Sequence, residues 1–336
     1  MSPSLPPMEA FLQAIERFAA ASNAPSAEQA LAAVADTSAS LPLDNLDRLE
    51  RRIRWELSAA KPAHAGFWSR AKPARHLSWL DLGNADGHVR ERTLRSLSAA
   101  PNALCLALAL ALRRLNDWVP EVRAAARAHL PGIAHSSAPE HVAEALWAVL
   151  CNVASWGRLG TPERHTLDAL IAFEPVRLAL YTRICNAATG PATSILVQIT
   201  RTPVFDPWLH TLARQAVQPA VRARTLRFLL EGRAFWFAGR AWTWTDLKWC
   251  EGKYEPVIDE RPLQVNYPRQ QLLETALRDA APAVRHVAAE TLILHLPSFG
   301  AQASALATIL AADRSARIAA RGRFVLAQLA KANCPA

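Results

Sequence analysis

The chain has 336 residues, 51% of them hydrophobic, and its net charge of +9 favours acidic partners. The longest apolar run, Ala103–Leu112, is too short to cross a bilayer and predicts a buried helix. Met1–Ala10 has three prolines and lacks the basic and apolar regions of a secretory signal. We therefore expect a basic, cytoplasmic protein with no membrane partner.

The first predicted region, residues 1–82, is helical and carries a basic aromatic loop. Residues 48–95 hold eleven Lys or Arg against five acids, so this segment supplies +6 of the total charge. Its candidates for binding anions or nucleic acid are Arg70, Lys72, Arg75, Arg90 and Arg92. In the alternative interpretation, Trp68 and Trp79 pin the loop to the helices while the bases face water.

A repeated string begins in the second predicted region, residues 83–233, and returns in the last, residues 269–330. Asp117 is followed by Val122-Arg123, Ala126 and Leu130, and the same spacing recurs from Asp279 through Arg285 to Leu292. Shorter versions surround three further arginines, namely Arg90, Arg222 and Arg317. Pro120, Pro219 and Pro282 precede the Val-Arg pair, where proline fits the first turn of a helix. A period near 33 residues is typical of stacked helix pairs.

The string D-x-x-x-x-V-R-x-x-A-x-x-x-L and its period resemble the HEAT-like helical repeats. The resemblance implies an all-α fold, an α-solenoid of helix pairs curved into a superhelix, whose second helices line a concave surface. It also implies that Asp and Arg of successive repeats bridge one another. The structural repeat residues would be Asp117, Arg123, Arg222, Asp279, Arg285 and Arg317. Three units depart from the string: Asn84 and Ala216 replace the Asp, and Asp313 lies too close to Arg317.

Residues 234–268 predict a non-helical, aromatic-rich insertion. Seven of the twenty residues Phe235–Tyr254 are aromatic, and Ala241–Thr245 alternates like a short strand. Two interpretations stay open. The partner-binding candidates Trp242, Trp244, Trp249 and Tyr254 anchor another protein, or these rings fold back on the flanking helices as a packed satellite core.

Motifs for chemistry are missing from the sequence. It has no G-x-G-x-x-G, no phosphate-binding P-loop and no H-E-x-x-H. Its five cysteines are scattered without a C-x-x-C, and no pair of histidines is presented at helical spacing. We therefore expect no catalytic residue, no metal site, no cofactor and no enzyme.

Three functions fit these features. The first is a non-enzymatic scaffold that binds a protein, in particular an acidic one, through the concave face and the insertion. The second is nucleic-acid binding, in the extreme case as a HEAT-like alkylpurine DNA glycosylase, for which Trp118 with Asp117 or Trp244 with Asp246 would be the candidate pairs. The third is an inhibitor, immunity protein or assembly chaperone for one acidic partner.

Overall fold

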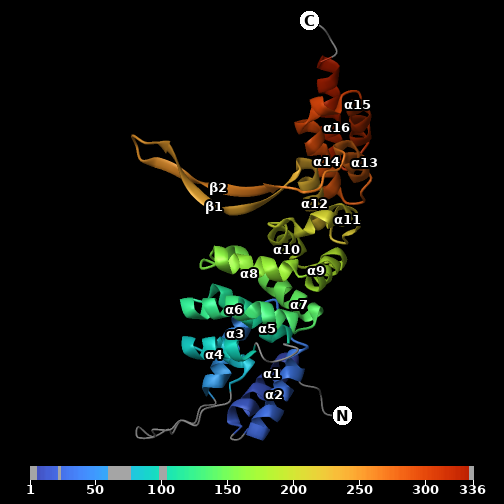
Figure 1. Ribbon diagram of the computed structural model, residues 1–336. Helices are drawn as coiled ribbons and strands as arrows, with labels where there is room; N and C mark the ends of the chain where they lie inside the picture. Colours follow the sequence, from blue (N-terminus) through green and yellow to red (C-terminus); the bar gives the residue numbers. More distant parts are fainter. Residues whose placement is uncertain (1–5, 22–23, 60–76, 98–103, 333–336) are drawn as a thin grey trace. The chain divides into compact units, whose positions relative to one another are not determined.

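The computed structural model describes residues 6–21, 24–59, 77–97 and 104–332, and its helices confirm the expected all-α class except at one two-stranded sheet. The chain divides into two compact units, Met1–Leu180 and Tyr181–Ala336. The boundary falls inside helix α9 (Glu174–Asn186). Each unit is described by itself, with the labels of Figure 1.

The first unit is built from helices that pack on their second neighbours as well as on their first. α4 contacts α6, α6 contacts α8, and α5 contacts α7. The predicted apolar helix is present as α5, and it is buried on every side from Leu106 to Leu112. The helices of this unit before α9 are α1 (Pro7–Ala20), α2 (Ala24–Ser38), α3 (Leu46–Ala59), α4 (Gly87–Leu97), α5 (Cys105–Arg113), α6 (Pro120–His135), α7 (Pro139–Leu150) and α8 (Thr161–Ala172), with 3₁₀ turns η1 (Trp79–Gly83), η2 (Arg114–Asn116) and η3 (Val153–Ser155).

The second unit repeats this packing and adds the sheet. α12 contacts both α10 and α14, and α14 contacts α16. Its elements after α9 are α10 (Ala192–Ile199), η4 (Pro203–Phe205), α11 (Asp206–Gln215), α12 (Pro219–Glu231), β1 (Arg233–Asp246), β2 (Glu251–Pro262), α13 (Arg269–Leu277), α14 (Pro282–Leu294), η5 (Leu296–Phe299), α15 (Gln302–Ala311) and α16 (Ala316–Ala332). Helices α6, α12 and α14 begin at the prolines that the sequence placed in the first turn.

A recurring arginine joins helices that are second neighbours. Arg90 of α4 donates to both carboxylate oxygens of Asp117, at 2.9 and 2.7 Å. Two more pairs have the same bidentate form: Arg222 with Asp279 and Arg285 with Asp313. Nη1 of each arginine also donates to the carbonyls five and six residues earlier. Each guanidinium therefore connects the loop before its own helix to the loop before the helix two positions later in the chain.

The aspartates of these pairs also shape their own loops. Oδ1 accepts the backbone N–H two residues later, from Val119, Ala281 and Ser315 respectively. Arg123 shares the bond to the carbonyl six residues earlier, that of Asp117, but its acidic neighbour is Glu163, whose carboxylate lies 3.8 Å away. Arg317 lies on α16, after which the described chain has no further helix.

Candidate functional site

The non-helical insertion folds into one long antiparallel hairpin, made of β1 and β2 and here called the hairpin (Arg233–Pro262). Figure 1 shows its two strands extending from the end of α12 beyond the helices that they connect. Phe237 pairs with Ile258, Trp242 with Tyr254 and Trp244 with Gly252. One extra residue, Ala238, shifts the register between Phe237 and Gly239. Because β2 runs without interruption, this bulge places Phe237 on the same face as Trp242 and Trp244.

This aromatic face is an exposed surface formed by Phe237, Trp242, Trp244, Tyr254, Pro256 and Ile258, and the exposed Arg240, which pairs with Pro256, lies on the same face. The ring of Trp242 meets those of Trp244 and Tyr254 edge-on, with centroids 5.5 and 5.1 Å apart. Trp242 also lies over Gly252, where an added Cβ would be 2.5 Å from the indole. The rings support one another, yet Trp244 remains 52% exposed and Tyr254 64%.

The opposite face of the same stretch has no aromatic residue and carries polar side chains together with Ala241 and Val257. Thr243 and Lys253 pair across the strands, and both contact Glu255, at 3.4 and 3.0 Å. Over the whole hairpin five Arg or Lys balance five Asp or Glu, so it carries no net charge in a chain of +9. Along this stretch the hairpin thus has one aromatic face, which also carries Arg240, one face without aromatic residues, and no net charge.

The tip is a four-residue loop, Leu247–Cys250, held by the side chain of Asp246. Its Oδ1 accepts the N–H groups of Lys248 and Trp249, at 2.8 and 3.1 Å. Cys250 has a φ of 53°, the left-handed conformation that lets β2 start back. Trp249 is 69% exposed at this tip. Asp246 is therefore committed to the turn.

The base of the hairpin is fixed by Arg261. Its guanidinium binds the carboxylate of Asp206 in a bidentate pair of 2.9 and 2.6 Å, and it also donates to the carbonyls of Thr200 and Thr202, both at 2.7 Å. Asp206 is fully buried and also accepts the N–H of Gln264 at 2.8 Å. One strand residue therefore holds the loop between α10 and α11.

Aromatic packing reinforces this base. Phe235 meets Phe228 of α12 edge-on at 5.3 Å, and the Arg224 guanidinium lies over both rings. Burial, with the nearby Arg227 charge, lowers the pKa of Arg224. The Arg201 guanidinium lies 5.1 Å from the Trp236 ring centre. At the base, then, the aromatic residues do pack on the helices.

The aromatic residues singled out by the sequence thus divide by position along the hairpin. Trp242, Trp244, Trp249 and Tyr254 are all exposed, so the satellite-core interpretation is wrong for them. That interpretation fits Phe235, which packs on α12. The sequence missed Arg261, because its partner Asp206 lies 55 residues away along the chain.

The predicted anion-binding residues lie in different environments. Arg70, Lys72 and Arg75, with Trp68, lie outside the described residues. Arg90 is 2% exposed and bound to Asp117, so its guanidinium is not open on the surface, whereas Arg92 is exposed. Trp79 is buried in η1. Asp117, one of the glycosylase candidates, is buried and holds two arginines.

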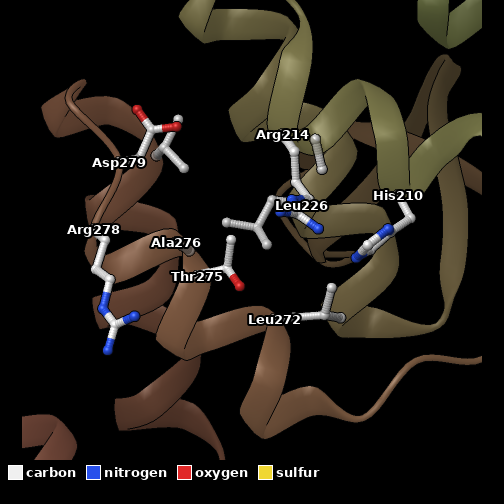
Figure 2. A pocket seen from close by; sticks show the side chains of 10 residues that line it. His210, Arg214, Leu226, Leu272, Thr275, Ala276, Arg278 and Asp279 are labelled. Atoms are coloured by element: carbon white, nitrogen blue, oxygen red, sulfur yellow. The ribbon is translucent and has the colours of Figure 1, made fainter.

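A small cavity of about 190 Å³ lies among α11, α12, α13 and the start of α14 (Figure 2). His210 and Arg214 reach it from α11, and His210 stacks on Tyr267 with ring centres 4.6 Å apart. Burial and the Arg214 charge lower the pKa of His210. Asp279 also lines it, but its carboxylate is bound by Arg222. The volume is below that of ordinary ligand pockets.

Comparison with protein-family models, curated proteins and solved structures found no match. No described helix is both long and apolar enough to cross a membrane.

Proposed function

We propose that the chain is a non-enzymatic binding module in which HEAT-like helix pairs stack as a solenoid and present the hairpin to another protein. The observation that carries the proposal is the aromatic face. It exposes two tryptophans, a tyrosine, a phenylalanine and an isoleucine on one face of the strand pair, with the Arg240–Pro256 pair between Phe237 and Trp242. Tryptophan and tyrosine dominate the energetic centres of protein interfaces, and exposed apolar surface of this kind marks a contact site.

The charge balance of the hairpin favours a protein over nucleic acid at this face. Binding to a phosphate backbone draws its affinity from an excess of Lys and Arg. The five basic side chains of the hairpin are matched by five acids, and Lys253 is engaged by Glu255. The bases of a strand could stack on the rings, but a hairpin of zero net charge offers its phosphates no cationic excess.

The firm base of the hairpin supports the same proposal. A two-stranded hairpin alone is marginally stable in water. Here Arg261, Phe235 and Trp236 fix its base to the helices of the second unit. The partner therefore meets a face that is already ordered, which lowers the entropy lost on binding.

Site-specific photocrosslinking in the source cells tests this function. One variant carries p-benzoylphenylalanine in place of Tyr254, on the aromatic face, and its matched control carries it in place of Thr243, on the opposite face of the same stretch. We expect Tyr254 to yield a discrete protein adduct that Thr243 does not, and we expect Trp242→Ala with Trp244→Ala to remove it. Equal labelling from both faces, or none from either, would contradict the proposal.

A further inference from the structure

A second cavity, of about 350 Å³, lies within the first unit. It is separate from the hairpin in sequence and in its chemistry. Four segments form its wall: α3, the loop before α4 with the first turns of α4, the stretch from the end of α5 to the start of α6, and the residues after η3. The lining residues are Glu50, Arg54, Ala85, Arg90, Arg113, Arg114, Asn116, Asp117, Trp118, Trp156 and Arg158. Five arginines thus face two carboxylates.

The two carboxylates are shared among four of the arginines. Glu50 accepts from Arg54 at 3.1 Å, from Arg113 at 2.9 Å and from Arg114 at 2.8 Å. Asp117 accepts from Arg90 at 2.7 Å and from Arg114 at 3.1 Å. Five positive and two negative side chains leave a formal excess of +3 among the lining residues, although Arg113 also binds Asp47, which does not line the cavity.

The buried part of this wall is electrically balanced, with two arginines paired to two carboxylates. Arg90, Arg114, Glu50 and Asp117 are all buried. Burial lowers the pKa of Arg114 and the neighbouring Arg113 charge adds to this, although Glu50 and Asp117 oppose both. The excess therefore lies on Arg54, Arg113 and Arg158, of which Arg54 is partly exposed and Arg158 exposed. An anion bound beside these side chains would be stabilised by their charge.

Two side chains at the cavity remain open to a ligand. Arg158 is exposed, and its described hydrogen bonds involve its backbone: the N–H donates to Oδ1 of Asn116, and the carbonyl oxygen accepts the N–H of Gly160. Trp118 is 65% exposed, with the Arg90 guanidinium 5.5 Å from its ring centre. A planar guanidinium fork matches phosphate oxygens, and an exposed indole offers its flat side to a nucleobase.

We propose that this cavity binds a nucleoside phosphate, with the phosphate beside Arg158 and Arg54 and the base against Trp118. The volume is in the range of small-ligand pockets. The same chemistry is offered by a free nucleotide and by a nucleotide within a single strand. The buried ion pairs position the cationic wall, while Arg158 supplies the contact that is free to form.

Isothermal titration calorimetry of the full chain at low salt tests the proposal. The ligands are AMP, inorganic phosphate and an eight-residue oligothymidylate. We expect AMP or the oligonucleotide to bind at least tenfold more tightly than phosphate, because only they carry a base. A tighter AMP complex assigns the site to a free nucleotide, and a tighter oligonucleotide complex assigns it to a strand.

Three substitutions locate the binding. Arg158→Ala should weaken it about tenfold, as expected for the loss of a charge-assisted contact. Trp118→Ala should weaken AMP but leave phosphate unchanged. Arg92→Ala is the matched control, because Arg92 is exposed on α4 and does not line the cavity. Equal losses in the Arg92 and Arg158 variants, or no binding of any ligand at millimolar concentration, would overturn the proposal.

Discussion

Replacing Arg261 by alanine should detach the base of the hairpin. The side chain is 14% exposed and its partner Asp206 only 1%, so this ion pair is largely removed from water. The substitution takes away both bonds to the Asp206 carboxylate and those to the carbonyls of Thr200 and Thr202. The N–H of Gln264 alone then remains, among the described contacts, on a buried negative charge.

Breaking one partner of a buried pair costs about 3–5 kcal/mol, because the other charge stays buried without compensation. We expect a loss of that size in the free energy of unfolding of the second unit, measured by urea denaturation. Hydrogen exchange should also accelerate along β1 and β2. Adding Asp206→Asn to the variant should restore part of the loss, since a neutral amide is cheaper to leave in the interior.

Arg240→Ala is the control for this experiment. Arg240 is exposed on the hairpin, so its removal should change the free energy of unfolding by no more than about 0.5 kcal/mol. The reasoning fails if Arg261→Ala is as mild as Arg240→Ala and hydrogen exchange in the strands is unchanged. It also fails if the double variant is less stable than Arg261→Ala alone.

Four further outcomes are expected. The hydrogen bonds from Arg285 lower the pKa of Asp313 below its ordinary value of 3.8. The pair therefore stabilises the fold fully above pH 3.8, and this stabilisation is lost as the pH falls through the lower pKa of the folded state. Asp313→Asn should reduce the loss of stability at acid pH, measured as the free energy of unfolding against pH. In α16, Gly322→Ala should destabilise by about 1–3 kcal/mol, because its Cβ would lie 2.2 Å from the Ala311 backbone nitrogen, whereas Gly132→Ala in α6 meets nothing and should stabilise by about 0.5–1 kcal/mol in thermal melts. Trp242→Ala with Trp244→Ala should keep the far-ultraviolet dichroism and the cooperative unfolding of the parent, and loss of cooperativity would show that these rings are core. Partner binding through the hairpin should weaken less than threefold between 50 and 200 mM salt, since the hairpin has no net charge; a steep decrease would favour the electrostatic docking of an inhibitor or assembly factor.

Local signals in the sequence predicted the helices well. Pro120, Pro219 and Pro282 mark helix starts because proline fits the first turn whatever its tertiary surroundings. The spacing from Asp279 to Arg285 was visible for the same reason, since both belong to one loop and one helix. Asp313 is closer in sequence to Arg317 than the repeated string requires. Its carboxylate nevertheless accepts hydrogen bonds from Arg285, as that of Asp117 does from Arg90.

The hairpin was harder to foresee because its alternation is interrupted. The bulge at Ala238 breaks the two-residue period between Phe237 and Gly239, so the visible pattern shrank to Ala241–Thr245. Arg261 and Asp206 are separated by 55 residues, and no local rule connects them. The arginine-lined cavity combines residues from Glu50 to Arg158, and such a set is assembled only by the packing of α3, α5 and α6.

The length of β1 has a mechanical consequence. Its fourteen residues reach roughly 45 Å at about 3.3 Å per residue, while the two strands stand only about 4.8 Å apart at the base. The length of the hairpin is therefore about ten times the separation of its strands. If one strand shifted by about 1 Å along the other at the base, the tip would move by about 10 Å. Holding Trp249 at a defined position thus requires the stiffest contacts at the opposite end, where Arg261 meets Asp206.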